Sequence, residues 1–463
     1  MGKSTASEWM RKTGLRVHDS DATVHSLYAA GGAATGPIEE AFPGVRAPDG
    51  SIDRVALSKA VATAGREESL KTLEKIVHPL VSASRQAFVE EAAADGEWLV
   101  VVDVPLLFET HADEQALRAS GIDSVLVVSA SSAVQRARVL ARPGMSAEKL
   151  DAILARQMAD AEKRSRADVV VATEGFPVAR AQLATAVAEL TERHSARWEA
   201  WLARRSDGSS TGSFPRARAV TFDLDDTTWP VLPPLLRAQD VLVSELMPKH
   251  MPRTVAAGEG TREAMKARMK PAADANPLVV HDLTELRRLS LGAMALEHGD
   301  PPDAVPTLID AFVEARAGSV AADLYADVAP CVASIRQLGL TVGALTNGNC
   351  DVTRADESVR SLFDVAVRAD EAGAAKPSVV PFLRAAAACG CHPSEVVHVG
   401  DSIEADLLGA LRCGMRAILL SREGFVRSGS DARAQRPPAD DARWREVATL
   451  EQAASVVREW AAE

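Results

Sequence analysis

The sequence predicts an α/β protein of two domains, and three observations support this fold class. The 463 residues are 47% hydrophobic and 25% charged, enough material for more than one buried core. Short apolar runs alternate with long alanine-rich segments, which is typical of parallel sheets covered by helices. A polar stretch rich in Gly and Ser, residues 203–216, interrupts this alternation and predicts a flexible linker. We therefore place one domain at 1–195, a linker at 196–216 and a second domain at 217–463, with no internal repeat.

The expected strands are the short apolar runs of each half. In the first half they are Trp98–Val104, Ser124–Val128 and Val169–Ala172. In the second half they are Ala219–Asp223, Thr341–Thr346, Val365–Arg368, Val396–Val399 and Ala417–Leu420. Between the first two strands of the second half, residues 229–333 have a helical pattern, which predicts an inserted helical cap.

Composition limits the kinds of partner. The formal net charge of −12 disfavours binding to nucleic acid or to a membrane surface, because both are anionic. The sequence contains no apolar run of the roughly 20 residues that a spanning helix needs. The five cysteines include no C-x-x-C pair, and an odd, unpaired set of cysteines is typical of a reducing compartment. We expect small-molecule substrates and a cytoplasmic location, with an organellar targeting peptide further upstream as the alternative.

The chain begins with half of a phosphate-binding motif. Gly2-Lys3-Ser4-Thr5 is the second part of G-x-x-x-x-G-K-[ST], in which backbone N–H groups and a Lys bind ATP phosphates and a hydroxyl binds Mg²⁺. Lys3 would bind phosphate, Ser4 would hold the metal, and Gly2 and Thr5 would complete the nucleotide contacts. The alternative is a chance match of four common residues. We expect about ten further residues upstream, which would supply the missing first strand and complete the loop.

Two carboxylates follow at a spacing that places them on one side of an extended segment. They are Asp19 and Asp21. A kinase acting on a hydroxyl needs one carboxylate beside the acceptor oxygen to take its proton. The alternative is a helix N-cap, since Asp is common in front of helices.

An ordered series of short motifs then extends across the first half. It comprises Asp49-Gly50-Ser51-Ile52-Asp53-Arg54, Val77-His78-Pro79-Leu80, the strand ending Val102-Asp103-Val104-Pro105, Gln135-x-x-Arg138-x-x-x-Arg142 and Gln157-Met158. In this order and spacing the series resembles the dephospho-CoA kinase family, over about residues 1–190. The resemblance implies a P-loop kinase fold with a nucleotide core, a helical subdomain on the CoA side and a lid, using ATP and Mg²⁺ to phosphorylate the 3′-hydroxyl of dephospho-CoA.

The resemblance also implies roles for particular residues. Asp21 matches the carboxylate proposed as the base, supported by Asp19. Arg138 and Arg142 lie on the lid, where guanidinium groups neutralise phosphates or stack on adenine; the alternative for this pair is a solvated helix face. The sequence departs from the family pattern at Ile153, where an Arg is usual, and at Pro143 after the lid arginines.

The second half contains a different set of chemical groups at strand ends. Asp223-Leu224-Asp225 follows the first strand, where a carboxylate that attacks phosphorus and another that transfers a proton would be placed. Thr346 ends the next strand, and Lys376 supplies a cation that offsets charge on a transferring phosphoryl group. Asp401 and Asp406 follow a further strand and suit Mg²⁺.

This ordered set resembles the haloacid dehalogenase superfamily, over about residues 216–463. The resemblance implies a Rossmann-like fold in which Asp223 is the nucleophile and Asp225 the general acid/base. Thr346 and Lys376 would stabilise the phosphate. Asp223, Asp225 and Asp401 would hold the metal, and Asp406 would orient Lys376 or support the metal.

Two details refine the expected activity. Dehalogenases of this superfamily lack the second carboxylate, whereas a phosphatase needs the proton donor that Asp225 supplies. The segment from His281 to Arg288 resembles the branch that acts on FMN or a ribityl phosphate. Arg287 and Arg288 are candidate substrate contacts there, with an exposed helix face as the alternative.

Together these observations predict a bifunctional enzyme. Its first domain would phosphorylate dephospho-CoA, and its second would hydrolyse a phosphate monoester through an aspartyl-phosphate. The alternative is an active phosphatase that carries a degenerate kinase domain as a CoA-binding or structural module.

Overall fold

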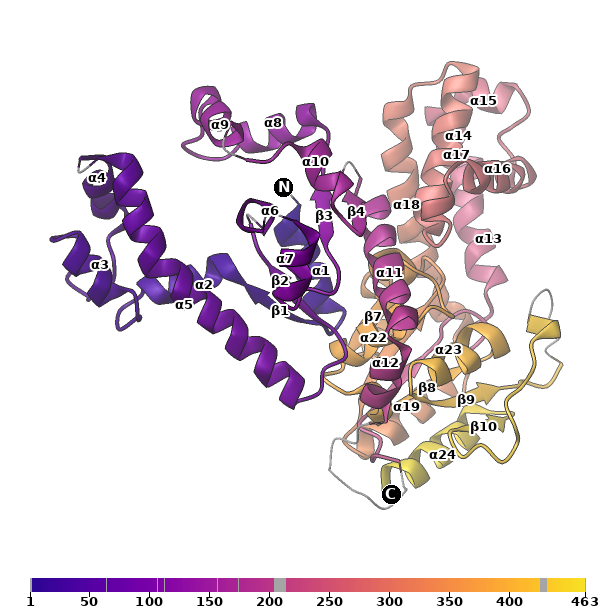
Figure 1. The fold of residues 1–463 in the computed structure, drawn as a ribbon. Coiled ribbons are helices and arrows are strands. Elements are labelled where there is room, and N and C mark those ends of the chain that lie inside the picture. The colour runs from indigo at the N-terminus through magenta and orange to yellow at the C-terminus, as the bar shows by residue number, and fades with distance from the viewer. Residues whose placement is uncertain are drawn as a thin grey trace. The chain divides into compact units, whose positions relative to one another are not determined.

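The computed structural model describes eight stretches of the chain. These are residues 2–63, 65–105, 107–111, 113–155, 157–173, 175–203, 214–424 and 431–462. The chain divides into two compact units, shown in Figure 1. The first comprises 1–11, 15–127 and 135–169, and the second comprises 12–14, 128–134 and 170–463.

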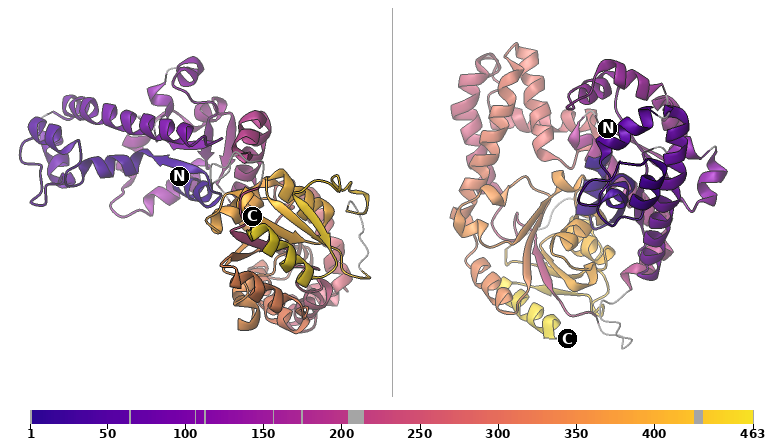
Figure 2. Two further views of the ribbon diagram at one scale, coloured as in Figure 1. Left: turned by 90° about the horizontal axis from the view of Figure 1, so that it is seen from below. Right: turned by 90° about the vertical axis from the view of Figure 1, so that its left-hand side faces the viewer.

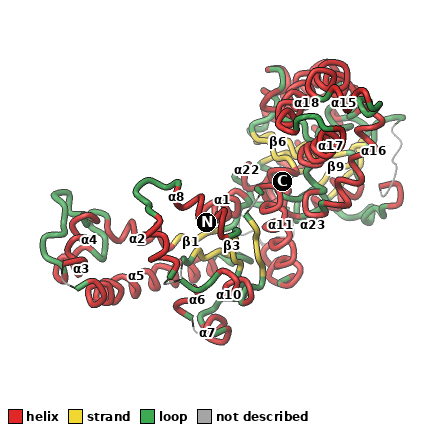
Figure 3. Tube along the Cα trace, turned by 90° about the horizontal axis from the view of Figure 1, so that it is seen from above, coloured by secondary structure: helices red, strands yellow, loops and turns green. Residues whose placement is uncertain are grey.

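The N-terminal half contains four short strands. They are β1 (Arg16–Asp19), β2 (Val100–Asp103), β3 (Leu126–Ser129) and β4 (Val169–Ala172). β1 pairs in parallel with β2, so that Asp19 lies opposite Asp103. β3 pairs with β4, and within the described residues these two pairs are separate two-stranded sheets. Figure 3 shows the short strands in yellow.

Helices account for most of the first unit. They are α1 (Lys3–Lys12), α2 (Ser20–Tyr28), α3 (Thr35–Ala41), α4 (Arg54–Thr63), α5 (Arg66–Ala94), α6 (Leu107–Thr110), α7 (Glu114–Ala119), α9 (Ala147–Leu154) and α10 (Asp160–Ser165). α8 (Ser132–Leu140) is divided in this assignment: its residues up to 134 belong to the second unit and the rest to the first. α2, α3 and α4 pack along the long helix α5, where Ile38, Val45 and Leu57 belong to one apolar core. This core forms the predicted helical subdomain.

A six-stranded parallel sheet organises the second unit. Its order is β10-β9-β8-β5-β6-β7, so the chain builds the sheet outward from β5 in both directions. The strands are β5 (Ala219–Phe222), β6 (Thr341–Thr346), β7 (Val365–Arg368), β8 (Val396–Gly400), β9 (Arg416–Leu420) and β10 (Trp444–Val447). β5, β8 and β9 are buried along their whole length, as expected for strands covered on both faces. In Figure 2 the yellow C-terminal helix lies against the sheet.

Helices cover both faces of this sheet. They are α11 (Phe176–Arg193), α12 (Ser195–Leu202), α19 (Val328–Gln337), α20 (Glu357–Arg360), α21 (Ala369–Ala372), α22 (Val379–Ala388), α23 (Gly409–Arg412) and α24 (Leu450–Ala462). α19 and α24 share one core with the sheet, in which Val332, Val399 and Val457 are almost fully buried. None of the described helices is long and apolar enough to cross a membrane.

The cap consists of helices inserted after β5. It comprises α13 (Leu232–Asp240), a π-helical segment Val241–Leu246, α14 (Met247–His250), α15 (Pro252–Ala256), α16 (Arg262–Ala275), α17 (Leu283–His298) and α18 (Val305–Ser319). Leu242, Met294 and Phe312 are fully buried in a core of its own. The predicted cap limit at 333 is too late, because α19 packs in the core of the sheet.

All eight predicted strands are present. Three have the predicted bounds and the others differ by one or two residues at an end. β10 was not predicted, and residues 16–19 were expected only to be extended. Residues 204–213 of the predicted linker lie outside the described residues. The assignment of 196–202 to the linker is wrong, because these residues belong to α12. α11 belongs to the second unit rather than to the first domain, and its Arg180 donates to the carbonyl of Asp370 (3.1 Å).

Asp282, in the inserted cap, makes the stability of the second unit pH-dependent. Asp282 caps α17 by accepting from the backbone N–H of Glu285 (2.8 Å), and burial raises the pKa of Asp282 to about 6. When folding raises the pKa of an acid, the folded protein loses stability as the pH rises from the pKa in the unfolded state, about 4, to the pKa in the folded state. Asp282→Asn keeps the capping oxygen and removes the titration. The midpoint of thermal unfolding of the variant, relative to wild type, should therefore rise between pH 4 and pH 7 by a few degrees. A constant difference across this range would contradict the assignment.

Candidate active sites

The ends of three adjacent strands bring the predicted phosphatase residues together. β5 lies between β6 and β8, and Asp223, Thr346 and Asp401 lie at or just after the carboxyl ends of these strands. The chain leaves β5 toward β6 and later returns on its other side at β8. Such a switch of direction places a site at the carboxyl edge of a parallel sheet. The position of the site therefore follows from strand order.

A buried lysine links two of the carboxylates. The Nζ atom of Lys376 donates to Asp223 Oδ1 (2.6 Å), to Asp406 Oδ1 (2.6 Å) and to the carbonyl of Leu345 (2.8 Å). Burial opposes the charged form of Lys376, but the two carboxylates raise its pKa. The ammonium is therefore charged at neutral pH, and its three hydrogen bonds fix its position.

Asp406 positions this lysine. Its Oδ1 also shares a hydrogen bond with His398 Nε2 (3.0 Å), and its Oδ2 accepts from the backbone N–H of Ser402 (3.0 Å). Burial acts in the opposite direction, but Lys376 and His398 hold the pKa of Asp406 below its usual range. Protein donors thus engage both oxygens, which favours the predicted role of orienting Lys376.

The carboxylates leave an excess of negative charge that suits a divalent cation. Oxygens of Asp223, Asp401 and Asp406 lie within 4.8 Å of one another, and Lys376 is the cation bonded to two of these residues. Burial raises the pKa of Asp223 well above its usual range, and burial together with the charge of Asp406 raises the pKa of Asp401 to about 7. Hard carboxylate oxygens in such a group are the ligands that Mg²⁺ prefers. Asp223 and Asp401 are therefore fitted to hold Mg²⁺.

Asp225 faces other partners. Its Oδ1 accepts from the indole of Trp229 (3.1 Å), and its Oδ2 accepts from Arg316 of the cap (2.7 Å). Its carboxylate does not belong to the group of three that could hold a metal. The position suits proton transfer, whereas the metal role predicted for the Asp225 side chain gains no support from its contacts.

Thr346 is buried at the carboxyl end of β6, the strand next to β5. Its Oγ1 accepts from the backbone N–H of Gly348 (2.9 Å), which orders the turn after β6. Asn347 in this turn donates to the carbonyl of Lys376 (3.0 Å) and accepts from its backbone N–H (2.7 Å). The turn that would contact a phosphate is therefore tied to the lysine that would neutralise it.

The kinase candidates meet around Lys3. Gly2 has a positive φ of 103°, and Lys3 begins α1. The Nζ atom of Lys3 lies 2.7 Å from Asp103 and 3.6 Å from Asp21. Ser4 and Thr5 are exposed in the same first turn. The structure thus groups the predicted phosphate-binding lysine with the predicted base.

The two acidic residues after β1 have different positions. Asp19 caps α2, its Oδ1 accepting from the backbone N–H groups of Asp21 and Ala22 (3.0 Å each), so the capping alternative holds for this residue. Asp21 is exposed in the first turn and borders a cleft of about 750 Å³. The cleft extends between α2, α4 and α5 and is lined by Tyr28, Arg54 and apolar side chains. A hydroxyl-bearing substrate in this cleft would reach Asp21.

The two lid candidates are exposed, which fits both the lid assignment and the alternative of a solvated helix face. Arg138 is an exposed residue of α8, and Arg142 is exposed just beyond that helix. A neighbouring arginine, Arg136, pairs with Asp151 of α9 (2.6 Å). The nucleotide contacts of Arg138 and Arg142 stay predictions.

Four functional neighbours were not assigned from the sequence. Asp103 ends β2 and accepts from Ser7 (2.8 Å) as well as pairing with Lys3; an acidic residue at the end of an apolar strand was the available signal. His398 lies in the predicted strand Val396–Val399 and Trp229 follows the Asp223–Asp225 motif, but neither had an assigned role. Arg316 is 91 residues from Asp225, and no local pattern connects them.

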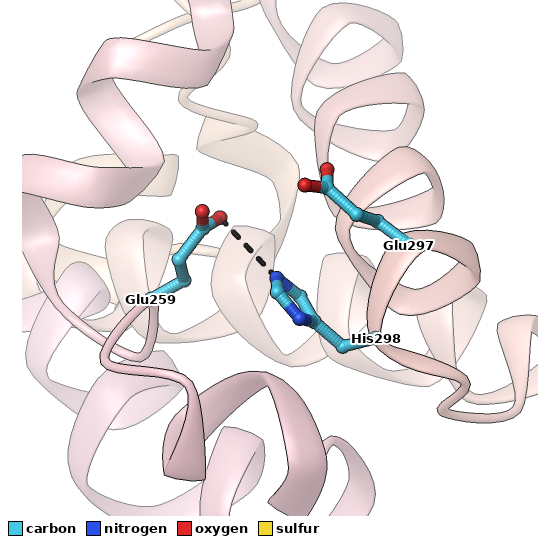
Figure 4. A group of neighbouring side chains, drawn as sticks. All are labelled: Glu259, Glu297 and His298. Carbon is cyan, nitrogen blue, oxygen red and sulfur yellow. Dashed lines mark ion pairs between the residues drawn. The ribbon is translucent and has the colours of Figure 1, made fainter.

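A second group that could hold a metal lies in the cap and has another explanation. Figure 4 shows Glu259, Glu297 and His298 together. Arg268 of α16 donates to both carboxylates, to Glu259 Oε2 through Nε (3.0 Å) and to Glu297 Oε2 (2.8 Å). The guanidinium supplies the positive charge that a metal would bring. This cluster ties α16 to α17.

Comparisons with known proteins match a different family to each half of the chain. A family model described as dephospho-CoA kinase matches residues 1–176, and one described as haloacid dehalogenase-like hydrolase matches residues 217–414. The dephospho-CoA kinase of Rhodopseudomonas palustris (strain HaA2) is 49% identical over 184 residues, covering 40% of this chain and 87% of that protein. The dephospho-CoA kinase of Rhizobium meliloti (strain 1021) is 48% identical over 191 residues, covering 41% of this chain and 93% of that protein.

Some solved structures resemble about half of this chain. A 2-haloacid dehalogenase from Pseudomonas syringae pv. Tomato DC3000 is 28% identical with a TM-score of 0.44, covering 53% of this chain and 99% of its own. A HAD phosphatase from Thermococcus onnurineus is 22% identical with a TM-score of 0.35, covering 52% and 97%.

The fold and the family matches therefore define an ATP-dependent kinase domain followed by a haloacid dehalogenase-like hydrolase domain. Through its N-terminal residues the chain belongs to the dephospho-CoA kinase family. Its C-terminal domain has the Rossmann-like haloacid dehalogenase fold.

The close approach of Gly348 to Asp225 gives a test of the site geometry. A Cβ at Gly348 would lie 2.3 Å from Asp225 Oδ2 and 3.1 Å from Thr346 Oγ1. Since Trp229 and Arg316 hold Asp225 from the other side, Gly348→Ala should displace the proton donor and lower kcat for phosphate esters by about tenfold or more. The midpoint of thermal unfolding should change little.

The matched control is Gly292→Ala in α17, where a Cβ would meet no atom within 4 Å. Equal kcat values for the two variants would show that Asp225 has room to move and would contradict the geometry.

Proposed function

We propose that this chain is a bifunctional enzyme. Its N-terminal domain transfers the γ-phosphate of ATP to the 3′-hydroxyl of dephospho-CoA, and its C-terminal domain hydrolyses a phosphate monoester with the help of Mg²⁺. The identity of 49% to a dephospho-CoA kinase over 184 residues supports the first activity. The Asp223–Lys376–Asp406 arrangement, with Asp225 beside it, supports the second.

In the kinase domain, Asp21 accepts the proton of the substrate hydroxyl. It lies at the border of the cleft between α2, α4 and α5 and 3.6 Å from Lys3. Lys3 neutralises phosphate charge, and Asp103 holds Lys3 at the start of α1 (2.7 Å). Ser4, Asp103 and Asp21 supply the oxygen atoms near which Mg²⁺ would bind with ATP.

In the phosphatase domain, a carboxylate oxygen of Asp223 attacks phosphorus and displaces the leaving oxygen. Asp225 gives a proton to that oxygen, and then takes one from the water that hydrolyses the aspartyl-phosphate. Lys376 and the turn after Thr346 offset the negative charge of the transferring group. Mg²⁺, when bound to Asp223 and Asp401, supplies further positive charge at the phosphate.

The finer assignments stay predictions. FMN and related ribityl phosphates are the substrates that the sequence motifs favour for the phosphatase. We also propose small-molecule partners only, without nucleic acid, and a cytoplasmic location.

Substitution of the nucleophile tests the phosphatase. Asp223→Asn keeps the hydrogen-bonding shape but cannot attack phosphorus, so release of inorganic phosphate from FMN and p-nitrophenyl phosphate should fall by about three orders of magnitude or more. Asp226→Asn is the matched control, because Asn tolerates the positive φ of 65° at this position and keeps the oxygen that accepts from Val231. Substantial activity in Asp223→Asn would refute the nucleophile.

A second matched pair tests the kinase. Asp21→Asn removes the base and should lower the rate of CoA formation from dephospho-CoA and ATP by about 10²-fold or more. Asp19→Asn, two residues away, keeps the oxygen that caps α2 and should retain most of the rate. A coupled assay that detects ADP measures both variants in the full-length chain.

Equal rates for the two variants would contradict the role of Asp21. A wild-type chain that forms no CoA, but melts at a higher temperature with dephospho-CoA and not with ATP and Mg²⁺, would instead support the CoA-binding module. The comparisons do not favour that alternative.

A further inference from the structure

Three buried side-chain donor atoms, two in the cap and one in the turn after β6, have no hydrogen-bond partner among the described residues. They are Arg287 Nη1 of α17, Arg316 Nε of α18 and Asn349 Nδ2 of the turn after β6. Buried polar groups in folded proteins are nearly always hydrogen-bonded, so a cluster of unsatisfied donors requires an explanation. All three lack an acceptor, and none is part of the catalytic steps described above.

Arg316 connects the cap to the catalytic carboxylate. The residue is 3% exposed, its Nη2 donates to Asp225 Oδ2 (2.7 Å), and its Nη1 donates to Asn349 Oδ1. These contacts pair its charge with Asp225 and fix its plane. Its Nε and the amide nitrogen of Asn349 have no acceptor among the described residues.

Arg287 supplies a second guanidinium, which, unlike that of Arg316, has no acidic partner among the described residues. Its Cζ lies 3.9 Å from the centroid of the Phe312 ring, so the ring supports one side of the guanidinium. Burial, with the charge of Arg316 next, lowers the pKa of Arg287 to about 10, which leaves it charged at neutral pH. Within the described part of the chain no carboxylate forms an ion pair with it. The region therefore carries one uncompensated positive charge.

The neighbouring Arg288 differs in each of these respects. It is exposed and pairs with Glu285 one turn earlier on the same helix. Of the two arginines that the sequence marked as candidate contacts, only Arg287 is directed into the protein.

The position of these donors identifies the part of the substrate that they face. Asp225 protonates the ester oxygen, so the leaving group lies next to Asp225, and Arg316 contacts that same carboxylate. An acidic substituent of the leaving group would supply both the missing acceptor oxygens and the missing negative charge.

We propose that Arg287, together with Arg316 and Asn349, forms a second anion-binding subsite that receives a carboxylate or a second phosphate on the leaving group of the substrate. This inference rests on the proposed phosphatase activity. It replaces FMN, whose riboflavin leaving group is uncharged, with esters of acidic alcohols as the expected substrate class. Phosphate esters with an acidic leaving group are the preferred substrates, and esters whose leaving group is uncharged leave Arg287 unpaired.

Matched substrate pairs test the subsite with the full-length chain and Mg²⁺. Glycerol 3-phosphate and 3-phosphoglycerate differ by a carboxylate, and fructose 1-phosphate and fructose 1,6-bisphosphate differ by a second phosphate. In at least one pair, kcat/KM for the acidic member should be about tenfold or more above that of the neutral member, because hydrogen bonds to charged groups have this strength. The pair that shows the preference identifies the anion.

The variant Arg287→Gln should lose that preference while kcat/KM for the neutral member changes by less than about threefold. Arg287→Lys, which keeps the charge, should retain part of the preference. Arg288→Gln should leave it unchanged and is the matched control on the same helix. The midpoint of thermal unfolding of Arg287→Gln should not fall, because the change removes an unpaired buried charge.

Two results would overturn the subsite. One is an absence of preference in both wild-type pairs. The other is an equal loss for both members of a pair in Arg287→Gln, which would mean that Arg287 only positions Arg316 and Asp225. Hydrolysis of p-nitrophenyl phosphate separates this failure from that of the proposed function, since a chain that hydrolyses no ester at all refutes both.

Discussion

The ammonium of Lys376 is the interaction on which the phosphatase site depends. It lies 2.6 Å from both Asp223 and Asp406 at a place where nearly all solvent is excluded. Two buried carboxylates this close would repel each other, and each would carry the cost of leaving water. The lysine compensates both, and the hydrogen bonds of His398 and Ser402 to Asp406 complete the arrangement. Loss of any member would leave a buried charge without its partner.

The same constraint explains how one sheet can present two neighbouring carboxylates, the proposed nucleophile and the proposed proton donor, in different surroundings. Asp223 faces the lysine and the other carboxylates, whereas Asp225, two residues later, faces Trp229 and Arg316. The turn between the strand and the cap thus directs two similar side chains into different electrostatic surroundings. Arg316 belongs to the cap, so the surroundings of the proton donor depend on a helix far along the chain. The proposed anion subsite and the proposed proton donor therefore share one residue, Arg316.

In the kinase domain the ion pair between Lys3 and Asp103 also holds a lysine in place, with one carboxylate instead of two. Asp103 at the end of β2 holds Lys3 at the start of α1, and Ser7 of the same helix bonds to the other carboxylate oxygen of Asp103. The lysine is about one-third exposed on its side chain, so solvent screens this pair more than the buried triad of the phosphatase. The pair positions Lys3 for phosphate, and the N-capping contacts of Asp19 leave Asp21 as the exposed carboxylate beside the cleft.

Local pattern alone determined much of this protein. The apolar runs identified all but two of the ten strands because a buried parallel strand must be apolar along its length, and the ordered motifs identified both families. Asp223, Thr346 and Asp401 were predicted as site residues because each ends or follows a predicted strand. The tertiary structure decided which groups meet across long separations. No sequence pattern connects Arg316 with Asp225, Lys3 with Asp103 or α19 with the sheet, since these contacts arise only when elements far apart in the chain pack together.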